Sequence, residues 1–117
     1  MERLTVYEKR TCTTCRNLAE LLAERGVDFD TVEYHVEGLP EDKLRDLLRK
    51  AGAGPRDVLR AREPLAQELD LVDNPPSDDE LIRLMAEHPV LVQRPIVERG
   101  DRAVLARPVE RVLDLLD

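Results

Sequence analysis

The chain has 117 residues, which is enough for one domain of ordinary size. Its 42% hydrophobic and 37% charged residues predict a folded chain rather than a disordered one. The net charge of −7 argues against direct nucleic-acid binding through a broad cationic face. No apolar run approaches the ~20 residues that span a membrane, and the first residues lack a signal-peptide pattern, so we expect a cytoplasmic protein.

Residues 1–38 predict a strand, a helix and a second strand. Leu4–Tyr7 is a short apolar run typical of a buried strand. Apolar residues at helical spacing follow, and Gly26 is a typical helix stop. Thr31–Val36 is β-branched and alternating, which predicts a second strand with His35 near its end. A strand, a helix and a strand within about 35 residues favour a parallel βαβ unit.

The middle of the chain, about residues 39–88, is predicted to be a helical insert. Ser77 is followed three residues later by Glu80, which is a capping-box pattern at the start of a helix. That helix is expected to end near His88, where the helix dipole favours a histidine. Further helical segments are predicted at about 39–51, 56–60 and 64–71.

The last part of the chain predicts β-structure followed by a helix. Val90–Val92 is expected to be a strand, and Ile96–Glu98 and Ala103–Ala106 are expected to form a β-hairpin. Pro108 opens a final helix. We therefore predict a single α/β domain with a four-stranded mixed sheet in the order βαβ, insert, ββα. The core at about 1–38 and 89–117 resembles the thioredoxin arrangement.

Both cysteines, Cys12 and Cys15, lie in one Cys-x-x-Cys segment at the predicted junction of strand and helix. A helix N-terminus stabilises a thiolate through its dipole and its unpaired N–H groups, and Lys9, Arg10 and Arg16 add positive charge nearby. A zinc site needs four ligands, which two cysteines and two distant histidines do not provide. The pair favours redox or nucleophilic chemistry, with two incidental thiols as the alternative.

Several segments resemble the glutaredoxin-coupled arsenate reductase family, which is related to the Spx-type RNA-polymerase-binding regulators. They cover nearly the whole chain, and the most specific is the His-Pro to Arg-Pro-Ile-Val stretch. The segments are Tyr7–Asn17 (YEKRTCTTCRN), Val58–Arg60, His88–Val97 (HPVLVQRPIV), Ala106–Pro108 and Val112–Asp114. The resemblance implies a thioredoxin-like fold with a cis peptide before Pro95.

The resemblance also implies the site residues. Cys12 would attack arsenate and form a thioarsenate ester, while Arg60, Arg94 and Arg107 would surround the oxyanion. Arginine suits this task because its planar donor fork matches a tetrahedral anion. A solvated surface position is the alternative for each arginine, since 15 of the 18 basic residues are Arg. In the family, glutathione supplies the second thiol and glutaredoxin completes the cycle; no bound cofactor or metal is expected.

Two residues depart from the family pattern. Cys15 occupies a position at which many reductases of the family have no second cysteine, so it could resolve Cys12 in a thioredoxin-dependent cycle or form a redox switch with it. Glu8 lies where these reductases often have a histidine, and a carboxylate pointing inward would raise the pKa of the thiol.

Three hypotheses follow. The first is an arsenate reductase, favoured by Arg107, which the Spx-type regulators generally lack. The second is an Spx-like redox sensor that binds the RNA polymerase α-subunit through a Cys12–Cys15 switch. The third is a family member with a different substrate, because a fold does not determine a function.

Overall fold

The computed structural model describes residues 3–9 and 11–116, and four of its strands form one mixed sheet. The strand order is β2-β1-β3-β4. β1 (Leu4–Glu8) pairs in parallel with β2 (Phe29–Glu33) and antiparallel with β3 (Ile96–Arg99). β3 continues into the antiparallel strand β4 (Arg102–Leu105). The predicted α/β class, the parallel βαβ unit and the hairpin are confirmed.

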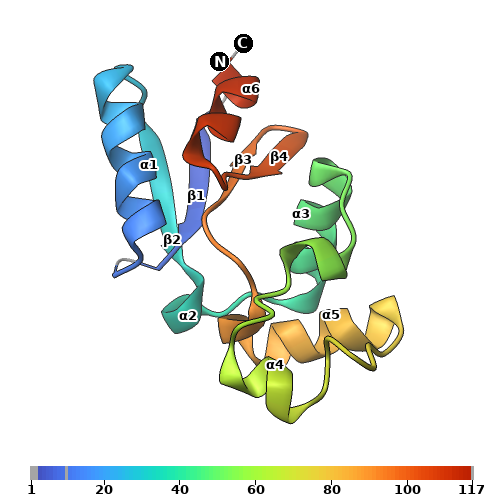
Figure 1. The fold of residues 1–117 in the computed structure, drawn as a ribbon. Coiled ribbons are helices and arrows are strands. Elements are labelled where there is room, and N and C mark those ends of the chain that lie inside the picture. Colours follow the sequence, from blue (N-terminus) through green and yellow to red (C-terminus); the bar gives the residue numbers. More distant parts are fainter. Residues whose placement is uncertain (1–2, 10, 117) are drawn as a thin grey trace.

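One face of the sheet is covered by the first and the last helices (Figure 1). α1 (Thr13–Glu24) connects β1 to β2, and η3 (Val109–Val112) leads into α6 (Leu113–Leu116). Alternation along the strands supplies the sheet side of this core, because every second side chain points to the same face. Its fully buried members are Leu4, Val6, Leu18, Leu22, Val97, Ala106, Val112 and Leu115.

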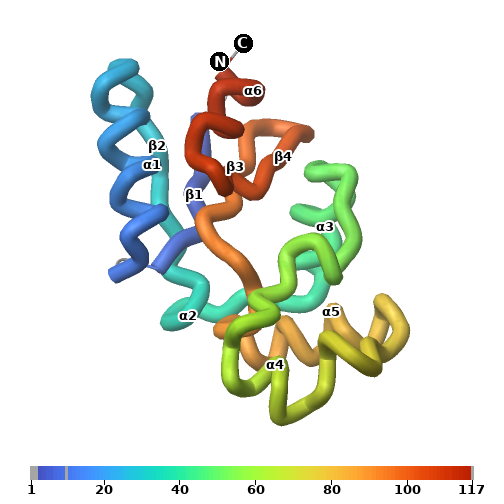
Figure 2. The backbone as a smooth tube through the Cα atoms, viewed as in Figure 1, coloured from blue at the N-terminus to red at the C-terminus, as the bar shows by residue number. Residues whose placement is uncertain are grey.

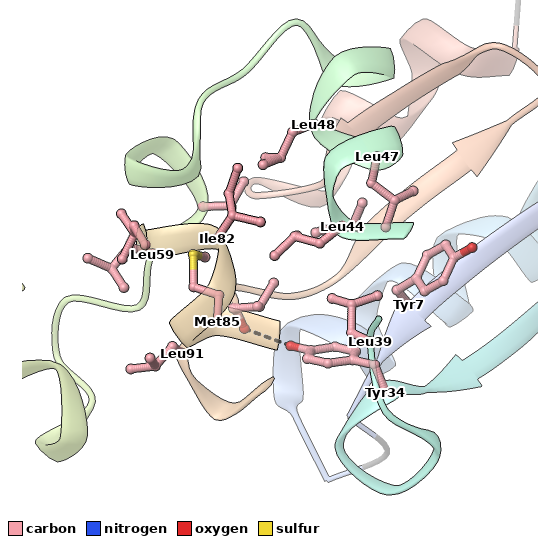
Figure 3. Packing of buried hydrophobic residues seen from close by; sticks show 14 of the residues in the cluster. Tyr7, Tyr34, Leu39, Leu44, Leu47, Leu48, Leu59, Ile82, Met85 and Leu91 are labelled. Carbon is pink, nitrogen blue, oxygen red and sulfur yellow. Dashed lines mark hydrogen bonds between the residues drawn. The ribbon is translucent and has the colours of Figure 1, made fainter. Parts of the chain in front are cut away.

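The opposite face of the sheet is covered by α3 (Glu41–Ala51), and α5 (Asp78–Glu87) packs on α3 beyond the sheet (Figure 1). Six helical segments in all lie between β2 and β3. They are α2 (Tyr34–Glu37), α3, η1 (Pro55–Val58), α4 (Pro64–Glu68), α5 and η2 (Pro89–Leu91). Tyr7 and Ile96 point to this side, one residue out of phase with Val6 and Val97. Figure 3 shows the aliphatic packing of this second core, in which Met85 fills the space between helices.

A buried carboxylate attaches α3 to the sheet. Glu98 of β3 is only 9% exposed and accepts a 2.8 Å hydrogen bond from the Tyr7 hydroxyl. Lys43 lies 3.0 Å from both Glu98 carboxylate oxygens, and Lys50 forms a second ion pair with the same group. The paired donors lower the pKa of Glu98 although burial alone would raise it. Helix α3 is thus joined to the sheet by charge as well as by leucines.

Several predicted helix boundaries can be compared with the structure. Ser77 precedes α5 and its Oγ accepts the Glu80 backbone N–H at 3.3 Å, so the predicted N-cap is confirmed. Gly26 follows α1 with a φ of 65°, a left-handed conformation that glycine adopts without strain. The segment predicted as helical at 64–71 is shorter than expected, because α4 ends at Glu68.

One predicted strand is shifted and another is wrong. Thr31–Val36 divides: β2 ends at Glu33, and Tyr34–Glu37 forms a helical turn, so His35 is not at a strand end. Burial of Tyr34 against the insert overrides the β-branched pattern, and Val36 is left 82% exposed. Val90–Val92 is mostly the 3-10 turn η2, closed by a 2.9 Å bond from the Val92 N–H to the Pro89 carbonyl. Only an isolated bridge between Val92 and Leu59 remains of the strand.

Candidate active site

Cys12 lies at the N-cap of α1, immediately after the loop that leaves β1. Its backbone N–H donates to the Lys9 carbonyl at 2.9 Å, and its carbonyl accepts the Arg16 N–H at 3.0 Å. The first turn of the helix carries no acidic residue, so its positive end faces the thiol without local compensation. Arg16 itself is exposed, and Arg10 lies outside the described residues.

The pKa values of the two thiols are shifted in opposite directions. Burial opposes ionisation of Cys12, but hydrogen bonding from the backbone and thiol of Cys15, together with Arg94, outweighs it and lowers the pKa of Cys12. Cys15 is only 2% exposed, and burial first, then the neighbouring Cys12, raises its pKa to about 12. Glu8 contributes to that rise through its charge. The geometry therefore favours a Cys12 thiolate beside a protonated Cys15, with both cysteines free.

Arg94 is the buried cation of the site. It is 7% exposed, and its hydrogen bonding and charge lower the pKa of Cys12. Its Nε is a buried donor without an acceptor among the described residues. Such an unsatisfied donor is costly and calls for an explanation, for example a ligand that supplies the acceptor. The Arg94–Pro95 peptide is cis, as the resemblance implies.

Arg60 and Arg107 line one open cleft of about 390 Å³ together with Gln93. Arg107 is joined to Arg94 by a 2.9 Å hydrogen bond from Nη1 to the Arg94 carbonyl. Arg60 is brought in by the main chain, since its N–H donates to the Leu91 carbonyl at 2.7 Å. The segments around Leu59 and Val92 run side by side in Figure 2. The structure therefore brings Arg60 and Arg107 to one cleft and joins Arg107 to the main chain of Arg94. Neither Arg94 nor Cys12 is among the described residues that line this cleft.

Two further residues face this region, and the sequence analysis did not assign them to it. The His35 Nε2 lies 3.4 Å from Arg94 Nη1. Tyr34 is fully buried beside it, and its hydroxyl donates to the Val92 carbonyl at 2.7 Å, the dashed contact in Figure 3. The sequence analysis missed both residues because it predicted a strand at 31–36. In the structure, the helical turn α2 directs Tyr34 and His35 towards the segment that carries Arg94.

Comparison with known proteins identifies the fold and the family. Residues 7–115 match the ArsC family. The chain belongs to the ArsC family. This membership confirms the resemblance through which the site residues were assigned.

Named relatives of this ArsC family chain include arsenate reductases. An arsenate reductase of Yersinia enterocolitica is 39% identical over 117 residues, covering 99% of this chain and 82% of its own. The arsenate reductase ArsI2 of Synechocystis is 37% identical over 114 residues, covering 97% of this chain and 81% of its own. The solved arsenate reductase from Vibrio cholerae superposes with a TM-score of 0.90 at 33% identity, covering 97% of both chains.

None of these three ArsC family relatives is named as an Spx-type regulator, so they lend that alternative no support. Within residues 3–9 and 11–116, no helix is long and apolar enough to cross a bilayer. The same residues contain no group of three or more His, Cys, Asp or Glu side chains arranged to hold a metal ion.

Proposed function

We propose that this protein is a thiol-dependent arsenate reductase in which Cys12 is the nucleophile. One observation carries the proposal: the buried Arg94, which lowers the pKa of Cys12, holds an Nε donor for which residues 3–9 and 11–116 supply no acceptor. A tetrahedral oxyanion placed beside Cys12 would supply that acceptor and receive charge-assisted hydrogen bonds. The relatives named as arsenate reductases support arsenate as that anion.

In the first step, the Cys12 thiolate attacks the arsenic of hydrogen arsenate. A sulfur–arsenic bond forms, and one arsenate oxygen leaves as water after taking up a proton. No electrons are transferred in this step. Because a thiolate and an arsenate are both negative, nearby cations must offset their repulsion and stabilise the transition state. Arg94, Arg60 and Arg107 are the groups we assign to this task, with backbone N–H groups of α1 as further donors.

In the second step, a thiol attacks the Cys12 sulfur and a disulfide forms. The electron pair of the sulfur–arsenic bond passes to arsenic, which is reduced by two electrons and leaves as arsenite. The attacking thiol loses its proton and supplies the second half of the disulfide. This step needs one further thiol besides Cys12, either within the chain or from a reductant.

We assign that thiol to Cys15. Two observations support this assignment: Cys15 lies one turn into α1 from Cys12, and its thiol helps to lower the pKa of Cys12. Before the first step it is protonated and supports the thiolate; afterwards it resolves the ester. Cys15 is buried whereas Cys12 is partly exposed, so an external dithiol such as thioredoxin would attack the resulting disulfide at Cys12. The glutathione and glutaredoxin route is the competing assignment.

The experiment follows arsenite formation by the purified wild type, Cys12→Ser and Cys15→Ser. Each is assayed with thioredoxin and its reductase, and separately with glutathione and glutaredoxin. We expect Cys12→Ser to be inactive in both assays. We expect Cys15→Ser to lose thioredoxin-supported turnover while its Cys12 still forms an arsenate adduct detectable by mass spectrometry.

Two results would contradict these assignments separately. Full glutathione-supported turnover by Cys15→Ser, with no thioredoxin-supported turnover by the wild type, would transfer the resolving role to an external thiol. Absence of arsenite with either donor, together with ready formation of a Cys12–Cys15 disulfide by mild oxidants, would remove the reductase function itself and favour the redox-switch hypothesis.

A further inference from the structure

We propose that His35 is a positioning residue that holds the Arg94 guanidinium against the Cys12 site by accepting a hydrogen bond from it. His35 Nε2 and Arg94 Nη1 are 3.4 Å apart, at the long end of hydrogen-bonding distances. A guanidinium has donors only, so the imidazole must be the acceptor. This requires a neutral His35 with its proton on Nδ1.

His35 is itself held in place by its neighbour. Its ring contacts the Tyr34 ring, with centroids 4.5 Å apart and planes tilted by 39°. Tyr34 is fully buried, and its hydroxyl donates to the Val92 carbonyl at 2.7 Å. Helix α2 therefore touches the segment that carries Arg94 at two points, once through the Val92 carbonyl and once through the guanidinium. Fixing both points limits the orientations open to Arg94.

The charges around His35 keep it in the accepting state. The pKa of His35 is lowered from 6.5 to about 4, first by burial and then by the charges of Arg94, Lys9 and Arg60, with Glu33 opposing them. Among the described residues, these charged groups face the imidazole from the β1–α1 loop, the insert, the 92–95 segment and β2. Protonation would place a cation against Arg94, so the contact is maintained only while the ring is neutral.

A neutral acceptor offers an advantage that a carboxylate would not. Arg60 lies 3.7 Å from the Glu63 carboxylate, which offsets part of its charge. The described residues place no carboxylate in an ion pair with Arg94. An imidazole therefore orients this guanidinium without neutralising it, leaving the full charge for Cys12 and for an incoming oxyanion. The part of the inference that concerns the oxyanion rests on the proposed function; the part that concerns the Cys12 thiolate does not.

Two substitutions of His35 distinguish the contribution of its hydrogen-bond acceptor from that of its aromatic ring. His35→Phe retains an aromatic ring against Tyr34 but removes the acceptor. His35→Gln removes the ring but retains an acceptor at a similar reach. For each variant, the rate of Cys12 alkylation by iodoacetamide is measured against pH, with the modified residue identified by mass spectrometry and the fold checked by urea denaturation.

We expect alkylation of Cys12 near neutral pH to fall about 5- to 10-fold in His35→Phe, because a displaced Arg94 raises the pKa of the thiol. His35→Gln should restore the rate to within about twofold. A purely structural role in packing would give the reverse order. An unchanged pH profile in His35→Phe, or an equal loss in both variants, would overturn the proposal.

A double-mutant comparison tests whether His35 acts through Arg94. In an Arg94→Ala background, His35→Phe should cause no further loss of Cys12 alkylation, because the group that His35 holds is gone. If the full effect of His35→Phe persists in that background, the histidine acts on Cys12 by another route and the inference fails. Because alkylation requires no arsenate, these outcomes are independent of whether the protein reduces arsenate.

Discussion

Arg107 donates from Nη1 to the backbone carbonyl of Arg94, 2.9 Å away, which joins two arginines that are 13 residues apart in the chain. One of them is buried at the thiol, and the other is exposed at the rim of the cleft that it shares with Arg60. The Arg107 guanidinium thus supports the main chain of Arg94 from the cleft in which an anion would bind. This dual engagement makes Arg107 an informative position to change.

Arg107→Ala is expected to reduce arsenate turnover by about 100-fold, because a preorganised donor to the developing charge is removed. Arg102→Ala is the matched control, since Arg102 is also exposed and donates to a backbone carbonyl, that of Asp114, at 2.7 Å. The control should retain activity within about twofold, as expected of a surface substitution outside the site. Steady-state arsenite formation measures both, and equal losses in the two variants would contradict a role in the site.

Cys15→Ala should raise the pKa of Cys12 and slow its alkylation near neutral pH. The substitution removes the thiol that hydrogen-bonds the Cys12 thiolate, while the backbone N–H of residue 15 remains. Alkylation rate against pH measures the shift. An unchanged Cys12 pKa would mean that the helix N-terminus and Arg94 alone ionise this thiol.

Acidification should destabilise the folded protein, because His35 binds a proton at a higher pH in the unfolded chain than in the folded one. His35 has its pKa lowered from 6.5 to about 4 in the folded state, first by burial and then by Arg94. Its contribution to stability is therefore complete above pH 6.5 and is lost as the pH falls towards about 4. Urea denaturation at pH 7 and near pH 5 should show a smaller loss for His35→Phe than for the wild type. Equal losses would count against a neutral, half-buried imidazole.

Glu98→Ala should destabilise the fold by about 2–3 kcal/mol, because it leaves two lysines and the Tyr7 hydroxyl without their shared acceptor. Glu98→Gln keeps an acceptor for Tyr7 and should lose less. The free energy of unfolding in urea distinguishes the two. If Glu98→Ala is as stable as the wild type, the ion pairs between α3 and the sheet contribute nothing net.

Ser77→Ala should cost about 1 kcal/mol, since it removes the side-chain acceptor of the Glu80 N–H at the start of α5. Ser77→Asp should retain most of the stability, because Asp is also a favoured N-cap. Thermal unfolding of the two variants tests this, and a loss shared by both would indicate a role for the hydroxyl outside the cap.

The parts of the fold that were predicted correctly are those determined by residues close together in the sequence. The Cys-x-x-Cys at a strand–helix junction, the Ser77 cap and the hairpin of Ile96–Glu98 with Ala103–Ala106 each depend on residues close together in the sequence, so a short segment is enough to predict them. The site arginines were assigned through the family resemblance rather than through pattern, because 15 arginines offer no local distinction among themselves.

The parts that the sequence concealed depend on distant partners. Thr31–Val36 has the composition of a strand, but Tyr34 finds its hydrogen-bond acceptor at Val92, 58 residues away, and the backbone turns to reach it. His35 approaches an arginine that is 59 residues away. The Glu98 cluster joins groups separated by 48 to 91 residues. No window along the chain contains both members of any such pair.

The pairing of the insert with the segment before β3 has a consequence for redesign. Two main-chain hydrogen bonds hold it, from the Arg60 N–H to the Leu91 carbonyl and from the Gln93 N–H to the Val58 carbonyl, each at 2.7 Å, and the Gln93 Nε2 adds a 3.2 Å bond to the Leu59 carbonyl. The spacing between the backbones of Arg60 and Arg94 is therefore independent of which side chains occupy either position. A library that varies residues 60, 93 and 107 could retune the charge, reach and polarity of the cleft for other oxyanions while the two segments keep their alignment.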